Sequence, residues 1–167
     1  KVAELTAAAV SKQSQMNSPE EFAGGAELFN MKPNIKRDDK SEFKLENVFV
    51  SWDEILRYVG PSLMNECTEV ELKDKLRLCA YHHAEDAIKI KLEHSRVVLL
   101  TITVDAIKVQ LQALRHMEPG VKRRTVSDTS TYWRLTDAGH QRLISAQAIR
   151  TAPKVVVGDE NVTGNAT

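Results

Sequence analysis

Two helix-start signals constrain the fold of this 167-residue chain more than any other feature. In each of the segments Ser51–Glu54 and Thr68–Glu71, a hydroxyl residue stands three positions before a glutamate, which is the spacing of a capping box. One helix is therefore expected to begin directly after each of these caps, and Gly60-Pro61 predicts the end of the first helix. Four residues of the second helix share one face at helical spacing and are expected in the core: Leu72, Leu76, Cys79 and His83.

Two strands and a third helix are expected around these two helices. Residues 42–50 alternate between apolar and polar side chains, which is the period of a half-buried strand, and the β-branched run 96–102 predicts a second strand. Thr103 is expected to cap the next helix, which continues to about Met117 and stops before Pro119-Gly120. The residues of this helix that are expected to face the core are Ile107, Leu111 and Leu114.

The last third of the chain has the pattern of a hairpin followed by a helix. Residues 121–126 and 131–135 are typical of strands on both sides of the turn residues 127–130. Thr136 predicts the start of a helix that extends to about Arg150. Helix, helix, short strand, helix, hairpin and helix is the order of a winged helix, a helix-turn-helix variant that carries a two-stranded wing.

These elements predict an α+β, mainly helical fold in three parts. A winged-helix domain is expected over residues 42–150, preceded by a helical arm or connector over 1–41 and followed by a flexible tail over 151–167. No run approaches the roughly 20 apolar residues that a membrane span needs. Cys67 and Cys79 do not make a disulfide framework, which favours a cytoplasmic location.

Three segments of the chain resemble a known family. "VSWDEIL" (50–56), "AIKVQLQALRHM" (106–117) and "YWRLTDAGHQRL" (132–143) are similar to the C-terminal winged-helix region of uncharacterised bacterial multidomain proteins. The N-terminal domain of those proteins resembles TIR or nucleoside deoxyribosyltransferase folds. The resemblance covers roughly residues 50–150, and it implies the winged-helix fold without a settled biochemical activity for this region.

Charge is unevenly distributed along the chain, although 23 basic and 23 acidic residues cancel overall. Residues 53–93 hold six basic and nine acidic side chains, whereas residues 96–150 hold nine basic and four acidic ones. The chain as a whole therefore has no net field that attracts nucleic acid, and any anion that binds is expected to use the second half.

Weakly specific binding of duplex DNA through the wing and the third helix is the first functional hypothesis. The candidate contacts are Lys108, Gln112, Arg115, Lys122, Arg123, Arg124 and Arg134. The cations are suited to phosphates and the glutamine to a base edge. The outward face of the third helix is expected to consist of Asp105, Val109, Gln112 and His116, which is a poor set for reading DNA.

A protein-interaction or dimerisation module of a larger bacterial protein is the alternative hypothesis. Val109 beside Ala113 suits a helix-to-protein surface better than a DNA groove. Cys79, His82 and His83 lie close together, but a structural zinc site needs four ligands. The chain has no spacing typical of a nucleophile with its base and no phosphate-binding loop, so we expect a non-enzymatic module without a cofactor, a metal or a small-molecule substrate.

Overall fold

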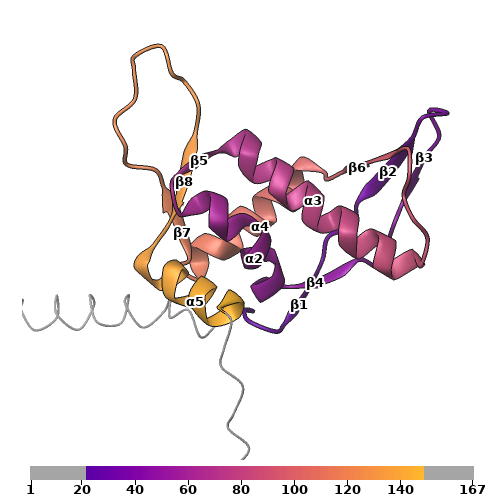
Figure 1. The fold of residues 1–167 in the computed structure, drawn as a ribbon, viewed down its shortest axis with the longest axis horizontal. Coiled ribbons are helices and arrows are strands. Elements are labelled where there is room, and N and C mark those ends of the chain that lie inside the picture. The colour runs from indigo at the N-terminus through magenta and orange to yellow at the C-terminus, as the bar shows by residue number, and fades with distance from the viewer. Residues whose placement is uncertain (1–21, 149–167) are drawn as a thin grey trace, which may run out of the picture.

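The computed structural model of the protein describes residues 22–148. This part of the chain is a mixed α+β structure with four helices and three small antiparallel sheets (Figure 1). In chain order its elements are β1 (Leu28–Asn30), β2 (Asn34–Arg37), β3 (Glu42–Lys44), β4 (Phe49–Ser51), α2 (Trp52–Leu63), β5 (Cys67–Thr68), α3 (Glu69–Ile88), β6 (Ser95–Val98), α4 (Thr101–Ala113), β7 (Met117–Pro119), β8 (Tyr132–Leu135) and α5 (Asp137–Gln147). The predictions for residues 1–21 and 149–167, including the flexible tail, lie outside the described residues.

The predicted helix starts of α2, α3 and α5 are confirmed. The Ser51 hydroxyl accepts a hydrogen bond from the backbone N–H three residues later, at 3.2 Å. Thr68 and Glu71 exchange both hydrogen bonds of a capping box, at 3.2 and 2.7 Å. The Thr136 hydroxyl accepts the N–H of Gly139 at 2.9 Å. Each cap satisfies backbone donors that the first helical turn leaves unpaired.

The predicted end of α2 at Gly60-Pro61 is wrong. The helix continues to Leu63 with Pro61 inside it, and the N–H of Met64 still donates to the carbonyl oxygen of Gly60 at 3.0 Å. The side chain of Leu63 is fully buried. We infer that burying this residue outweighs the one backbone hydrogen bond that a proline cannot donate.

The start of α4 also differs from the prediction, because the strand before it is shorter than residues 96–102. β6 ends at Val98, and α4 begins at Thr101. Thr103 is therefore not the cap; Leu100 holds the cap position and makes no side-chain hydrogen bond there. The earlier start places Ile102 on the helix.

The end of α4 comes before Met117, where the sequence predicted it. The N–H of His116 donates to the Leu111 carbonyl at 2.8 Å, and the N–H of Arg115 donates to the Gln112 carbonyl at 2.9 Å. Arg115 has a left-handed backbone with a φ of 56°. This pair of hydrogen bonds is a Schellman motif, which usually has a glycine at the left-handed position. Because an arginine stands there instead, no glycine marks the end of the helix in the sequence.

The predicted strand over residues 121–126 is wrong. β8 pairs with β7, which places Met117 opposite Leu135, and both side chains are buried. All residues from 121 to 126 are exposed. Pairing of β8 with β7 therefore buries more apolar surface than pairing of β8 with residues 121–126 would. β8 also pairs with β5, and the sheet order is β5-β8-β7. The connection between β7 and β8 is a long loop, residues 120–131, which projects from one end of the molecule (Figure 1).

The predicted helical arm is wrong for its described part, because residues 22–41 contain strands. β1 pairs with β4, and β2 lies between β3 and β6. The single strand predicted over residues 42–50 is divided into β3 and β4, which belong to different sheets. Met31 and Ile35 are fully buried. This segment is therefore part of the core.

The core lies between the four helices and the inner faces of the sheets (Figure 1). The side chains predicted to face it are confirmed as buried except for His83, which is half-buried; the buried ones are Leu72, Leu76, Cys79, Ile107, Leu111 and Leu114.

Candidate binding surfaces

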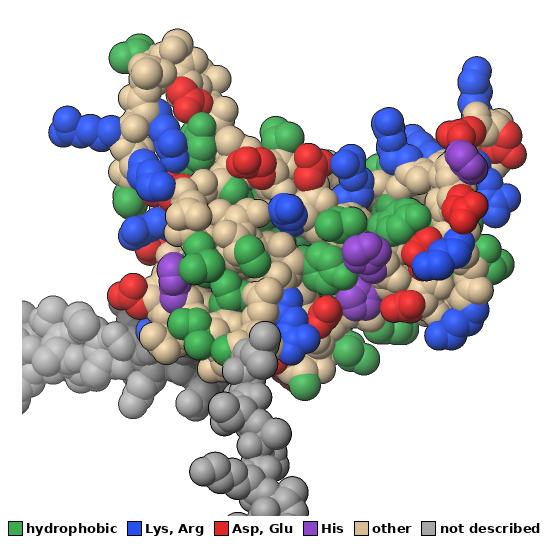
Figure 2. Space-filling view, viewed as in Figure 1, with side chains coloured by type: hydrophobic (Ala, Val, Ile, Leu, Met, Phe, Trp, Pro, Cys, Tyr) green, Lys and Arg blue, Asp and Glu red, His purple; other side chains and the backbone are tan. Residues whose placement is uncertain are grey.

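The basic run of the 120–131 loop is tied to Glu66. The carboxylate of Glu66 accepts the backbone N–H groups of Val121 and Lys122, at 2.8 and 3.0 Å, and the guanidinium of Arg124 at 2.7 Å. The side chain of Glu66 is only 5% exposed. Figure 2 shows the cationic side chains of this loop at one end of the molecule and those of the β2–β3 hairpin at the other. The loop cations nearest the fold are thus used to attach the loop.

The electrostatics of Glu66 keep this attachment charged at neutral pH. Burial by itself would raise the pKa of Glu66, but the N–H donors of Val121 and Lys122 and the charge of Arg124 lower it below its ordinary value. Arg124 also lies over the ring of Tyr132, 3.7 Å from the ring centroid. The ammonium of Lys122 donates to the Asn65 carbonyl at 2.8 Å. Of the three consecutive cations, Arg123 alone makes no ion pair or hydrogen bond through its side chain with the described residues.

Lys108 is a structural cation that links three elements. Its ammonium lies 3.2 Å from a carboxylate oxygen of Glu69 in α3 and 3.0 Å from one of Asp105 in α4. It also lies 5.6 Å from the ring centroid of Trp133 in β8. The side chain is 15% exposed. Burial alone would lower the pKa of Lys108, but the two carboxylates raise it above its ordinary value. A phosphate would have to displace both carboxylates in order to reach this ammonium.

Three other predicted contacts, Gln112, Arg115 and Arg134, come together at one groove. The groove has a volume of about 580 Å³ and lies between the end of α4, strands β7 and β8, and the start of α5. Arg134 is paired across the strands with Glu118 at 2.6 Å. The side-chain amide of Gln112 donates to the Lys108 carbonyl at 3.2 Å. The structure therefore divides the seven predicted residues among three places and neutralises Lys108, Arg124 and Arg134 with carboxylates.

The outward face of α4 is apolar along the length of the helix. At spacings of four, three and four residues it carries Ile102, Ala106, Val109 and Ala113. Ile102 is 75% exposed and Val109 is 64% exposed. We call these four residues the α4 stripe. Val109 and Ala113 were predicted on this face from the sequence, but Ala106 was not. Ile102 was missed because the predicted helix began too late.

The flanks of the α4 stripe only partly match the prediction. Asp105 and Gln112 are exposed on the helix, as predicted. His116 is not on the outward face, because it follows the end of the helix and is half-buried. Burial, together with the nearby charge of Arg142, lowers the pKa of His116.

The two cysteines have the chemistry of core residues. Burial raises the pKa of Cys79 to about 12 and that of Cys67 to about 11, so both thiols stay protonated at neutral pH. The ring Nδ1 of His83 lies 2.9 Å from the Cys79 carbonyl oxygen. Within residues 22–148, no three side chains of histidine, cysteine, aspartate or glutamate are grouped so that they could hold a metal ion.

Comparisons with known proteins found no matching family model, no similar curated protein and no similar solved structure. The resemblance to a bacterial winged-helix family therefore stays a prediction. Among the helices that the structure describes, none is long and apolar enough to cross a membrane.

Proposed function

We propose that the chain is a non-enzymatic, winged-helix-type module that associates with protein through the α4 stripe. The order α2, β5, α3, α4, β7 and β8 supports this arrangement, with α4 in the place of the recognition helix and the 120–131 loop in the place of the wing. The strand β6 is an addition to that order between α3 and α4.

The single observation that carries the proposal is the apolar outward face of α4. A recognition helix needs donors and acceptors to contact base edges and phosphates. Ile102 and Val109 have neither, and both are mostly exposed. The inward face of the same helix is buried in the core, so α4 is apolar on two sides, which is typical of a helix with a second packing partner.

A second copy of the chain is the partner that this surface fits. Ala106 lies midway along the stripe, between Ile102 and Val109, and its small side chain allows two helices to cross closely at that point. A two-fold dimer uses the same patch on both subunits, so one self-complementary stripe is sufficient. A 13-residue helix is about 20 Å long. Its face is smaller than the roughly 800 Å² per partner of a standard interface, so we expect a weak, concentration-dependent dimer.

Sedimentation velocity over a wide concentration range tests this proposal. The native chain is expected to shift from monomer to dimer as its concentration rises, and Ile102→Lys and Val109→Lys are each expected to stay monomeric. Val126→Lys is the matched control, because Val126 is a fully exposed valine on the 120–131 loop, away from the stripe. Far-UV circular dichroism checks that every variant is folded. A native chain that is monomeric throughout, or a Val109→Lys variant that dimerises like the control, would overturn the proposal.

Weakly specific duplex DNA binding is the second candidate, and it is supported by the guanidinium groups of Arg115 and Arg123. Both residues are exposed, and neither forms an ion pair within residues 22–148. The test is fluorescence anisotropy of labelled duplex DNA with the variants Arg115→Gly and Arg123→Ala, which leave the Glu66 contacts intact. Each variant is expected to weaken binding and to reduce the salt slope by about 1. Absence of binding at low salt would rule out this candidate.

A further inference from the structure

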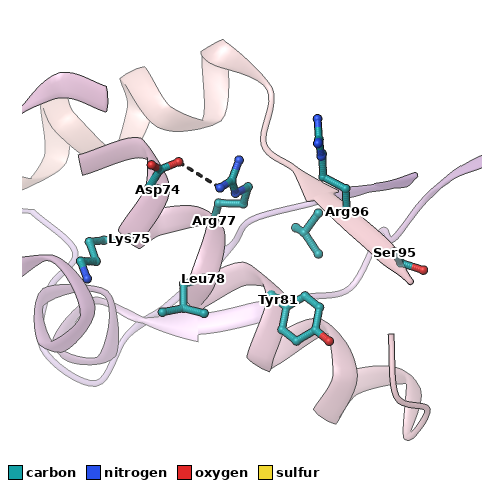
Figure 3. Close-up of a pocket in the computed structure, with 8 residues that line it drawn as sticks. Asp74, Lys75, Arg77, Leu78, Tyr81, Ser95 and Arg96 are labelled. Carbon is teal, nitrogen blue, oxygen red and sulfur yellow. Dashed lines mark ion pairs between the residues drawn. The ribbon is translucent and has the colours of Figure 1, made fainter. Parts of the chain in front are cut away.

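A groove runs between α3 and β6 and reaches Thr101 and Val104 at the start of α4. It consists of two adjoining hollows of about 630 and 320 Å³, which share Asp74, Arg77, Arg96 and Val97. Figure 3 shows Arg77, Leu78 and Tyr81 reaching from α3 on one side, with Ser95 and Arg96 of β6 on the other. The groove is open along the outside of the molecule.

β6 is an edge strand, and its free edge borders this groove. In the sheet order β3-β2-β6 its only strand partner among the described residues is β2. Residues 95–98 all line one or both hollows. Side chains alternate between the two faces of a strand, so a hollow over one face would be lined by every second residue. Because four consecutive residues of β6 line the hollows, the hollows lie along the edge of the strand and not over one of its faces.

The hydrogen-bond pattern of β2 shows which backbone groups of β6 are free to pair. The N–H of Arg37 donates to the Ser41 carbonyl at 2.9 Å, so Arg37 and the other odd-numbered residues of β2 point toward β3. The even-numbered residues point toward β6, where Lys36 is opposite Arg96. Val97, the next residue of β6, therefore directs its N–H and carbonyl away from β2. These groups point toward the groove and are available to a further strand.

The groove is lined by an excess of cationic side chains together with the apolar side chains of Leu78 and Val97. Four cationic side chains and one carboxylate line the two hollows: Lys73, Lys75, Arg77, Arg96 and Asp74. Asp74 is paired with Arg77 at 3.0 Å, and Lys73 is paired with a glutamate outside the groove at 3.1 Å. The ion pairs of the described residues include none to Arg96. Leu78 is 43% exposed beside the buried Val97.

We propose that this groove binds an extended segment of another protein, in which apolar and acidic residues alternate, as an additional antiparallel or parallel strand on β6. Main-chain hydrogen bonds from Val97 supply pairing, as in other strand-addition complexes. Alternate side chains of the bound segment point to opposite faces. Apolar ones pack on Leu78 and acidic ones approach Arg96. The four residues of β6 match a segment of about four to six residues.

The test is fluorescence anisotropy of a labelled octapeptide that alternates valine and glutamate, titrated with the full chain at low and physiological salt. Two control peptides isolate the two features of the proposal. An alternating valine–lysine octapeptide reverses the charge, and a valine–glutamate octapeptide with alternate backbone nitrogens methylated cannot pair as a strand. The protein variant Arg96→Glu tests the groove, and Arg123→Glu is its control, because it makes the same charge change on the 120–131 loop.

We expect the valine–glutamate peptide to bind and the two control peptides not to bind. The Arg96→Glu variant is expected to weaken this binding about tenfold or more, and Arg123→Glu is expected to leave it unchanged. Absence of binding even at low salt would overturn the proposal. Equal binding of the methylated peptide would exclude strand pairing and overturn it as well. Binding of duplex DNA that is lost in Arg96→Glu, without binding of the peptide, would make the groove a polyanion site instead.

Discussion

Replacing Gly139 by alanine tests how α5 is held against the end of α4. Gly139 is the third residue of α5 and is buried. A Cβ atom at this position would lie 2.1 Å from the carbonyl oxygen of His116 and 2.9 Å from its carbonyl carbon. The clashing atoms belong to the backbone, so no side-chain rotation relieves the contact. The same carbonyl oxygen accepts the N–H of Thr136 at 3.2 Å, so moving it away from α5 stretches a hydrogen bond.

The expected cost follows from these contacts. The Cβ and the oxygen must separate by about 1 Å to reach van der Waals distance. Overpacking of this kind costs about 1 to 3 kcal/mol, and the weakened hydrogen bond adds about 1 kcal/mol. The higher helix propensity of alanine returns up to about 1 kcal/mol. Because the displacement is large, we expect a loss of about 2 to 3 kcal/mol, which lowers Tm by roughly 5 to 10 °C for a chain of this length.

Urea unfolding followed by far-UV circular dichroism measures this loss. Ala138→Gly is the matched control, because it reverses the alanine–glycine exchange at an exposed position on the same helical turn. It is expected to cost no more than about 1 kcal/mol. A Gly139→Ala variant that is as stable as the native chain, or more stable, would refute the close approach of α5 to His116.

Three further predictions concern single residues. Glu66→Gln is expected to lower the global unfolding free energy and to speed hydrogen exchange at the Val121 and Lys122 amides, since the charged carboxylate holds the loop in the folded chain; unchanged exchange would contradict the attachment. Arg115→Gly is expected to raise the unfolding free energy by up to about 1 kcal/mol, because glycine adopts the left-handed backbone at less cost, and a loss would contradict the Schellman assignment. Burial lowers the pKa of His116, so the unfolded chain binds a proton first as pH falls below the ordinary value of 6.5. The unfolding free energy of the native chain should therefore fall as the pH drops from the ordinary pKa toward the lowered pKa of His116. Over the same pH range, the His116→Gln variant should lose less unfolding free energy than the native chain, as measured by urea unfolding at neutral and mildly acidic pH.

The helix starts and the core-facing helical residues could be predicted from the sequence because they depend on neighbours in the chain. The Thr68–Glu71 capping box is complete within four residues. The burial of Ile107 and Leu111 follows from helical periodicity, which spans only one or two turns. The end of α4 was not predicted, because Arg115 has the left-handed backbone at the position where a glycine usually ends a helix.

The binding surfaces were decided by the tertiary structure. The sequence predicted a cluster of cations for phosphate, but Arg124 is neutralised by Glu66, which is 58 residues away along the chain, and Lys108 by Glu69, which is 39 residues away. The free edge of β6 likewise exists only because β2, far upstream, pairs with its other edge. Local patterns determine which segments form helices, since caps and periodicity act over a few residues. The charges and backbone groups that remain free for a partner depend on contacts between distant segments, which form only when the chain is folded.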